Sequence, residues 1–366
     1  MRTKLVAVAA AGLVTLSSAV GCTDDSGGNS TAVLGTGEGK VGVILPDTET
    51  SQRWGSDDPK LLKAAFDAAE VPVDIQNAQG RAENFTRIAD AMIAGGAKVL
   101  MIASLDSVSG KAVLDKANAA GVATIDYDRL TLNGNADYYV SFDNIQVGRL
   151  QGRGLVRCLS AKGVKKPTVV YLNGAPTDNN ATLFKRGYDE ILQPRYDSGV
   201  YLKGPDQPVP RWNNDEGRFI FEQMYNQTEG KIDGVLAAND GLGNAAITIL
   251  KREGRNGAIP VTGQDAEIQG LQNILAGDQC MTVYKPIKKE AQAAAKLAIS
   301  LFKGEKATAD GRVKDPESGG YVPSVLLAPT AIFKKDIGIV IKDGFVDKKT
   351  VCAGRFAKLC RQNGIK

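Results

Sequence analysis

The sequence predicts an α/β fold in which helices cover both faces of parallel β-sheets, and two observations support this fold class. First, from Lys40 onward short apolar runs rich in β-forming residues alternate with helix-like patterns. Strands that alternate with helices form crossover units, and these build parallel sheets that are covered on both faces. Second, the chain has 366 residues, of which 43% are hydrophobic and 23% charged. This is enough for two lobes, each with its own core.

Eight apolar runs predict the strands, and the stretches between them predict the helices. In one such stretch Phe85, Ile88 and Met92 fall on one helical face after Asn84, and the glycine pair 95–96 ends the pattern. This spacing, with a capping residue before it and glycine after it, is typical of an amphipathic helix. The predicted strands are 41–45, 71–75, 99–102, 122–125, 169–172, 235–238, 259–261 and 281–284.

The first residues have the layout of a secretory signal. Arg2 and Lys4 are basic, residues 5–16 form an apolar run too short to span a bilayer, and small residues follow at 17–21. Cys22 comes directly after them. The segment resembles the cleavage box of bacterial lipoproteins, in which this cysteine carries the lipid. An ordinary signal followed by an incidental cysteine is the alternative.

We therefore expect residues 1–21 to be a lipoprotein signal peptide and Cys22 to be the lipidation site. Residues 22–39 are rich in Gly, Ser, Thr and Asp and predict a flexible tether. Together these segments predict a protein that works outside the cytoplasm, is anchored to the cell membrane through its N-terminal lipid, and contacts the membrane only there.

Histidine is absent from the sequence, and the charges are nearly balanced. Without histidine, Ser-His-Asp and Cys-His nucleophiles and His-ligated zinc sites are excluded. The net charge of +4 gives no reason to expect nucleic acid as a partner. No group of residues has the spacing of a metal site, so we expect no cofactor, no metal and no catalytic residues.

Four cysteines remain after Cys22. Cys352 and Cys360 are close in sequence and can close a small C-terminal loop if the segment between them is not one straight helix. On a continuous helix their Cα atoms would lie about 12 Å apart, too far for a disulfide. Cys158 and Cys280 are a second candidate pair, since disulfides are permitted outside the cytoplasm.

Polar and aromatic residues follow the predicted strands. In open parallel sheets ligands bind at the carboxyl ends of the strands, so these residues are candidates for a binding site. Carboxylates accept hydrogen bonds from hydroxyls, Arg and Lys donate, Asn does both, and flat indoles cover the C–H faces of a sugar ring. The set predicts a sugar site: Arg53-Trp54, Asp128-Arg129, Asn179-Asn180, Trp212, Asn239-Asp240, Gln264-Asp265 and Lys285.

Four longer segments resemble one known family. They are YDRLTLNGNADYYVSFDNIQVGRLQG (127–152), NGAPTDNNATLF (173–184), AANDG (237–241) and VTGQDAEIQGLQNILAGDQCMTVYKP (261–286). They resemble the bacterial D-xylose-binding proteins of ABC importers and the related multiple-monosaccharide-binding proteins, over about residues 40–345. The phrases IASLDS and GQDAE lean toward the multiple-sugar relatives, whereas AND and TVYKP lean toward the xylose proteins.

The resemblance implies a periplasmic-binding-protein fold of type I, with two Rossmann-like lobes joined by a three-strand hinge. The N-terminal lobe would comprise residues 40–141 and 285–322. The C-terminal lobe would comprise 142–284 and 323–345, followed by a C-terminal extension at 346–366. It also implies a monomer without enzymatic activity that binds D-xylose and delivers it to an ABC permease in the membrane. A receptor for several monosaccharides (glucose, galactose, arabinose), used in transport or sensing, is the alternative.

The resemblance also implies which residues contact the ligand. Thr182 and Lys185 depart from the residues usual in the xylose proteins, and the loop 203–212 aligns loosely. The residues that match the family's ligand positions are Arg53, Trp54, Asp128, Arg129, Asn180, Trp212, Asn239, Asp265 and Lys285.

Three other functions compete with sugar binding. Residues 241–246 fit G-x-G-x-x-A after a predicted strand, with Asp265 about twenty residues later, as in dinucleotide-binding enzymes. Asp128 and Asp265 could serve a glycosidase as its two carboxylates. A sugar-responsive repressor shares the lobed fold, but an export signal stands where its DNA-binding headpiece would be. GTGEGK at 35–40 lacks the Walker spacing and belongs to the tether.

Overall fold

The computed structural model describes residues 39–365, and the predicted alternation of strands and helices runs through them. The predicted signal peptide, Cys22 and residues 23–38 of the tether lie outside the described residues. Within residues 39–365, none of the helices combines the length and the apolar character that crossing a bilayer requires.

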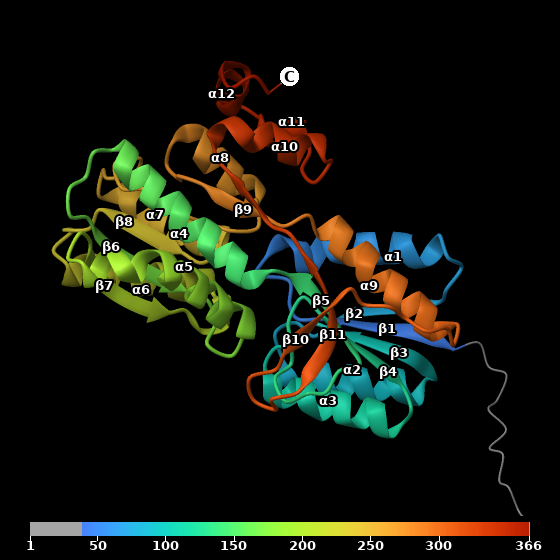
Figure 1. Ribbon diagram of the computed structural model, residues 1–366. Coiled ribbons are helices and arrows are strands. Elements are labelled where there is room, and N and C mark those ends of the chain that lie inside the picture. The colour runs from blue at the N-terminus through green and yellow to red at the C-terminus, as the bar shows by residue number, and fades with distance from the viewer. Residues whose placement is uncertain (1–38, 366) are drawn as a thin grey trace, which may run out of the picture. The chain divides into compact units, whose positions relative to one another are not determined.

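Seven strands form the larger sheet (Figure 1). Neighbours pair in parallel across it, except that β10 runs antiparallel to β11. Across the sheet the order is β10 (Gly311–Lys314), β11 (Tyr321–Leu327), β5 (Tyr138–Phe142), β4 (Ala123–Tyr127), β3 (Ala97–Ile102), β1 (Lys40–Leu45) and β2 (Val73–Asn77).

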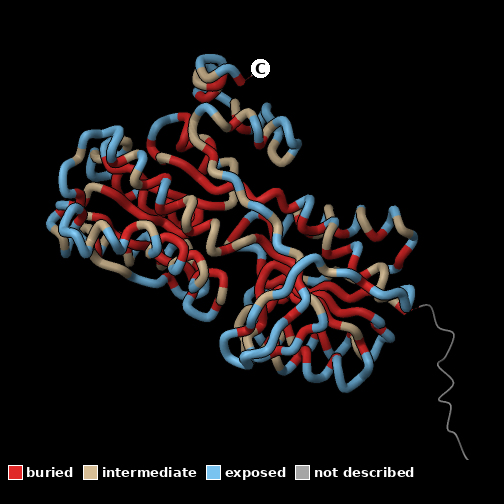
Figure 2. The backbone as a smooth tube through the Cα atoms, in the orientation of Figure 1, coloured by how far each residue is buried: buried red, intermediate tan, exposed pale blue. Residues whose placement is uncertain are grey.

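Helices cover both faces of this sheet, as expected for crossover units. Helices α1 (Asp58–Asp67) and α9 (Ile287–Phe302) contribute to one apolar core, whereas α2 (Ala82–Ala94) and α3 (Ser107–Ala119) contribute to a second core. Figure 2 shows the strands buried and the outer helix faces exposed.

The smaller part of the fold is built on strands β7 (Leu202–Pro208), β6 (Thr168–Asn173) and β8 (Gly234–Ala237), which pair in parallel, and on the antiparallel pair β12 (Thr330–Ile332) and β9 (Thr282–Tyr284). One core joins the three parallel strands to α4 (Asn144–Ala161), α5 (Asn179–Asp197), α6 (Asn214–Gln227) and α7 (Asp240–Arg252). Helix α8 (Ile268–Ala276) packs in a separate apolar cluster with Tyr284 of β9 and Ile332 of β12.

The chain passes three times between these two parts: from β5 to α4, from β9 to α9 and from β11 to β12 (Figure 1). Two of the connections lie side by side, because the Asp143 N–H donates to the carbonyl of Leu327 at 2.9 Å. Three short connections can bend together without disturbing either core. The lobe limits implied by the family resemblance stay a prediction. The predicted boundary between the lobes at residues 322 and 323 falls within β11.

The C-terminal segment packs on α8. Helices α10 (Ile337–Lys342), α11 (Lys348–Val351) and α12 (Phe356–Gln362) share an apolar cluster with it. Because α11 and α12 are separate helices, Cys352 and Cys360 come within 5.9 Å between Cα atoms, and a disulfide joins them. A second disulfide joins Cys158 to Cys280.

The sequence pattern located most buried strands and missed several others. Strand β2 begins at Val73 rather than at residue 71, and the predicted strand 259–261 forms only a bridge between Val261 and Val235. Strands β7 and β10 lie at sheet edges and are largely exposed, so they lack a buried apolar face that a sequence pattern could reveal. The sequence analysis also did not predict β5, β11 and β12, and Pro323 interrupts the strand pattern of β11.

Candidate ligand-binding site

One cavity, here called the central cavity, is formed by residues that follow β1, β4, β6, β8 and β9. It holds about 360 Å³ of space not filled by atoms, part of which is open to solvent. All nine residues matched to ligand positions line it. Five more residues line it as well: Thr50, Ser51, Asp178, Phe184 and Gln264.

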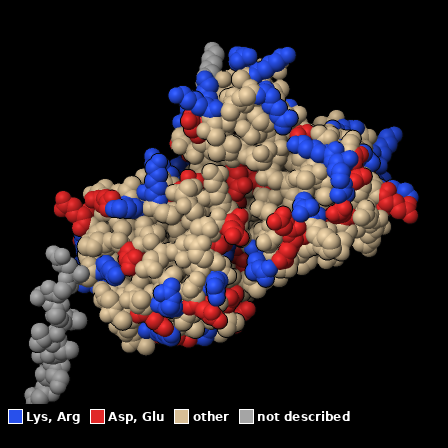
Figure 3. Space-filling view, turned by 180° about the vertical axis from the view of Figure 1, so that it is seen from behind, with Lys and Arg blue, Asp and Glu red and all other residues tan. Residues whose placement is uncertain are grey.

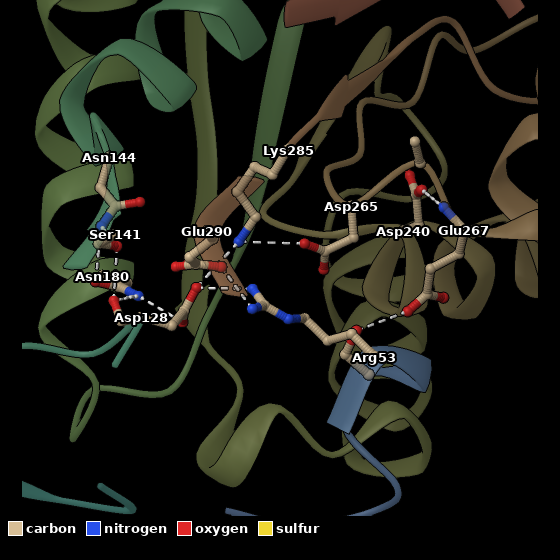
Figure 4. Close-up of polar contacts among 12 residues, drawn as sticks. Arg53, Asp128, Ser141, Asn144, Asn180, Asp240, Asp265, Glu267, Lys285 and Glu290 are labelled. Carbon is tan, nitrogen blue, oxygen red and sulfur yellow. Dashed lines mark hydrogen bonds and ion pairs between the residues drawn. The ribbon is translucent and has the colours of Figure 1, made fainter. Parts of the chain in front are cut away.

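Arg53 is the centre of a buried ion network (Figure 4). It lies in a π-helical turn, Arg53–Asp57, directly before α1. Its guanidinium donates to both carboxylate oxygens of Asp58 at 2.7 and 2.8 Å, to Asp128 at 2.8 Å and to Glu290 at 2.6 Å. These bonds fix the plane of the guanidinium. Burial raises the pKa of Glu290 well above its usual value, and Arg53 offsets only part of this.

Lys285 extends the charged side of the cavity. Its ammonium lies 3.7 Å from Asp128 and 3.3 Å from Asp265. Burial lowers the pKa of Lys285, but Asp265 and Asp128 outweigh this effect and raise it. Burial likewise raises the pKa of Asp128, but Lys285, Arg53 and Arg129 outweigh it and hold that pKa below its usual value. The cavity therefore presents ionised donors and acceptors side by side.

Neutral amides line another side of the cavity. The Asn180 amide donates to the backbone carbonyl of Asp128 at 3.0 Å and to its carboxylate at 3.1 Å, and its oxygen accepts from Asn144 at 2.8 Å. The Asn239 oxygen caps α7 by accepting from the N–H of Leu242 at 2.8 Å. Because capping occupies this oxygen, the amide nitrogen of Asn239 is the group left to donate to a ligand.

The two tryptophans of the chain both line the cavity. Trp54 is buried, with the Arg53 guanidinium 4.1 Å from its ring centroid. The ring of Trp212 lies so close to Gly174 that any side chain at that position would collide with it. The indole N–H of Trp212 donates to Asp178 at 3.1 Å, which fixes the orientation of the ring.

Three lining residues have a backbone conformation that residues other than glycine rarely adopt. The φ angles are 64° at Asp128, 56° at Trp212 and 100° at Asp265. Such conformations cost free energy and are concentrated at functional sites. Their presence in one cavity supports its assignment as the functional site.

Two acidic side chains near the cavity are engaged by the protein itself. Asp240 is fully buried and accepts from Gln279, Thr282 and the N–H of Glu267 at 2.7 to 3.0 Å. Glu267 accepts from the Ser51 hydroxyl at 3.1 Å, and burial together with Asp265 raises its pKa to about 7. Across residues 39–365, no group of three or more Asp, Glu or Cys side chains is arranged to hold a metal ion.

The glycine motif at 241–246 opens α7, but its glycines serve internal packing. A side chain at Gly241 would collide with Asn214, and one at Gly243 would press on the carbonyl of Thr262. The N–H of Asp240 already donates to the carbonyl of Gln264 at 2.9 Å. These contacts occupy the space and the donors that a pyrophosphate would need, so the geometry does not support dinucleotide binding.

Comparison with known proteins gives concordant matches. Residues 41–306 match the model of the periplasmic binding protein domain family. The chain is 35% identical over 309 residues to a D-xylose-binding periplasmic protein of Escherichia coli, covering 84% of this chain and 91% of the relative. It is 33% identical over 321 residues to a multiple sugar-binding periplasmic receptor of Rhizobium radiobacter, covering 84% and 90%.

Solved structures agree with the sequence matches. An ABC transporter solute binding protein from Clostridium phytofermentans with bound β-D-glucose superposes with a TM-score of 0.78 at 28% identity, covering 85% of this chain and 99% of that one. A carbohydrate transporter solute binding protein from Chloroflexus aurantiacus in complex with D-glucose superposes with a TM-score of 0.77 at 27% identity, covering 85% and 97%. The predicted type I fold is thereby confirmed, and these relatives are binding proteins rather than enzymes.

Proposed function

The chain belongs to the periplasmic binding protein domain family, and from this premise we propose that it is the extracytoplasmic binding protein of an ABC importer that takes up D-xylose. The observation that carries the proposal is the central cavity, in which all nine matched residues meet. It combines carboxylates, cations and amides with two indoles, so it can satisfy a ring of hydroxyls and cover the ring faces.

The preference for xylose rests on the motifs AND and TVYKP, which lean toward the xylose proteins, and the two departures from the family pattern lie away from the cavity. Thr182 is exposed, and Lys185 pairs with Asp189 and Asp206 at 2.7 and 3.1 Å. Neither of them is among the residues that line the central cavity. These two departures therefore do not change the lining of the central cavity.

Charge favours a neutral ligand. Figure 3 shows Asp and Glu side chains gathered along a hollow between the two halves of the molecule. Negative potential around an entrance repels anions. Uronic acids and sugar phosphates would therefore bind less well than a neutral aldose.

Binding and transport follow from closure of the two parts on the sugar. A ligand that bonds groups of both parts favours the closed state through the contacts it makes only there. Closure about the three connections then presents the permease with a surface that the open form lacks. No bond of the sugar is made or broken.

Titration calorimetry of the purified protein tests the proposal with xylose, arabinose, ribose, glucose and galactose. We expect binding of xylose in the micromolar range or tighter, with a fluorescence change from Trp54 or Trp212 and much weaker binding of the hexoses. Comparable binding of glucose or galactose would instead assign the protein to the multiple-sugar receptors. The match to one such receptor is the observation that supports this alternative. No binding of any of the five would refute the sugar assignment.

Anchoring through Cys22 is part of the same proposal and lies outside the described residues. If Cys22 carries the lipid, the Cys22→Ser variant should be released from the membrane fraction. In the wild-type protein, mass spectrometry of the N-terminal peptide should find diacylglycerol on Cys22. An unmodified cysteine in a membrane-free protein would indicate an ordinary signal peptide.

A further inference from the structure

A second and larger cavity adjoins the central cavity. It holds about 1,470 Å³ of space not filled by atoms, against about 360 Å³ for the central cavity. We call it the outer cavity; among the residues that line it are Asp47, Glu49, Asp106, Val108 and Arg211. It offers ample room for a second sugar ring, so the structure raises the question of what keeps a longer ligand out.

Four residues line both cavities and thus stand between them: Thr50, Arg129, Asp178 and Trp212. Asp178 contacts two of the others. Its carboxylate oxygen Oδ2 lies 3.2 Å from Nε of Arg129 and accepts from the Trp212 indole at 3.1 Å. These three side chains form a continuous wall, here called the dividing wall.

The dividing wall joins the two parts of the fold. Arg129 follows β4 of the larger sheet and donates to the carbonyl of Ser104 at 3.2 Å. Asp178 follows β6 of the smaller part and caps α5, because its other carboxylate oxygen accepts from the N–H of Asn180 at 2.9 Å. The side chains of Arg129 and Asp178 are only 10% and 4% exposed. A buried ion pair that is tied on both sides is a rigid barrier.

We propose that Asp178 determines specificity: with Arg129 and Trp212 it closes the central cavity toward the outer cavity and so restricts the ligand to a single free sugar ring. This inference rests on the proposed function. A disaccharide such as xylobiose would have to pass its second ring through the dividing wall, and it would separate the buried charges of Arg129 and Asp178. Xylose fits without disturbing them.

Asp178→Ser tests the proposal, because serine keeps an oxygen to cap α5 but is too short to complete the dividing wall. Xylobiose is a suitable probe, since it presents a xylose ring substituted at O1 or at O4, whichever position faces the wall. We expect the wild type to bind xylose at least about a hundredfold more tightly than xylobiose, and the variant to reduce this ratio about tenfold or more.

Two further variants separate the size of the side chain from other effects. Asp178→Asn keeps the volume and an acceptor for Trp212 but removes the charge that pairs with Arg129, so its ratio should fall by less than that of Asp178→Ser. Asp106→Ser is the matched control, because Asp106 caps α3 and lines the outer cavity but not the central one. It should leave the ratio unchanged. Circular dichroism of each variant checks that it is folded.

Each result is decisive. Wild-type protein that binds xylobiose about as tightly as xylose would overturn the inference and leave the proposed function intact. An unchanged ratio in Asp178→Ser, or a ratio changed as much by Asp178→Asn as by Asp178→Ser, would also overturn it. Wild-type protein that binds neither sugar would overturn both the inference and the function on which it rests.

Discussion

The central cavity has two dissimilar walls. The charged wall consists of Arg53, Asp128 and Lys285, and every one of these side chains is already paired by its neighbours. The amide wall consists of Asn180, Asn239 and Gln264. On this wall the protein leaves groups for a ligand: the Oε1 atom of Gln264 is buried and has no hydrogen-bond partner.

The difference separates two tasks. The charged wall is held in place by its own ion pairs, so it orients a sugar without reorganising, which lowers the cost of binding. In the amide wall, Gln264 Oε1 is buried without a protein partner, which costs stability until a ligand or a water donates to it. We therefore expect substitutions in the charged wall to affect stability and binding together, and substitutions in the amide wall to affect mainly binding.

The largest expected effect comes from Arg53→Met, which breaks the charged wall. Without the guanidinium, the buried carboxyl groups of Asp58, Asp128 and Glu290 lose their common cationic partner. Removing one partner of a buried ion pair costs about 3–5 kcal/mol. The free energy of unfolding should fall by that amount in urea titrations, and xylose binding should be lost. Arg53→Lys should restore only part of both, since an ammonium cannot reproduce the two parallel bonds to Asp58.

The control for Arg53→Met is Arg149→Met. Arg149 pairs with Glu190 at 2.6 Å, but both side chains are 36% exposed, and exposed pairs contribute little to stability. If the two variants lost equal stability, the charged wall would not be the self-supporting structure described above.

The sequence predicted the strand ends and hence most of the cavity. Asp128, Asn239 and Lys285 stand just beyond apolar runs, Arg53 lies in the loop after the first run, and the parallel sheets bring such positions to one edge. The α/β class followed from the same alternation, because the period of apolar residues reflects the face that each element buries.

The partners that hold Arg53 could not be predicted from the sequence. Glu290 lies on α9, 237 residues further along the chain. In the sequence it cannot be distinguished from the exposed charged residues of an amphipathic helix. Asp178 had a local signal, as an acidic residue that caps the helix after a predicted strand. Its contact with Arg129 depends on how the two parts of the fold meet, and its contact with Trp212 depends on the pairing of β6 with β7, neither of which a local pattern encodes.

An intermediate effect is expected from Asn239→Ser in the amide wall. Serine keeps the oxygen that caps α7 but removes the amide donor, so one hydrogen bond to the sugar is lost. Xylose affinity should fall about tenfold, whereas the free energy of unfolding should change by less than about 0.5 kcal/mol. Calorimetric titration and urea unfolding of the same preparation measure the two.

Asn213→Ser is the matched control for this variant. Asn213 caps α6 by accepting from the N–H of Glu216 at 2.9 Å and is not among the residues of the central cavity. It should leave xylose affinity unchanged. A large loss of stability in Asn239→Ser would mean that the amide wall, too, supports the fold.

The smallest expected effect concerns Glu267, which touches Ser51 across the cavity rim. Its pKa in the folded protein is about 7, above the usual value of an unfolded glutamate, about 4.3. The folded state therefore holds the proton over a pH range in which the unfolded state has released it, so stability falls as pH rises through that window. Glu267→Gln removes this loss. The effect is reduced because Glu267 is partly exposed. From pH 5 to pH 8 we expect the free energy of unfolding of the variant to increase by about 1 kcal/mol relative to that of the wild type.

Urea unfolding at both pH values measures this gain as a difference between two proteins, so other titrating groups cancel. Asp126, whose pKa burial likewise raises to about 7, is present in both proteins and contributes equally. Glu83→Gln, at a highly exposed position, should show no such difference. The opposite result would be a variant that is more stable than wild type at pH 5 but not at pH 8. It would show that folding stabilises Glu267 as a carboxylate, so that its contact with Ser51 belongs to a charged rim rather than a neutral one.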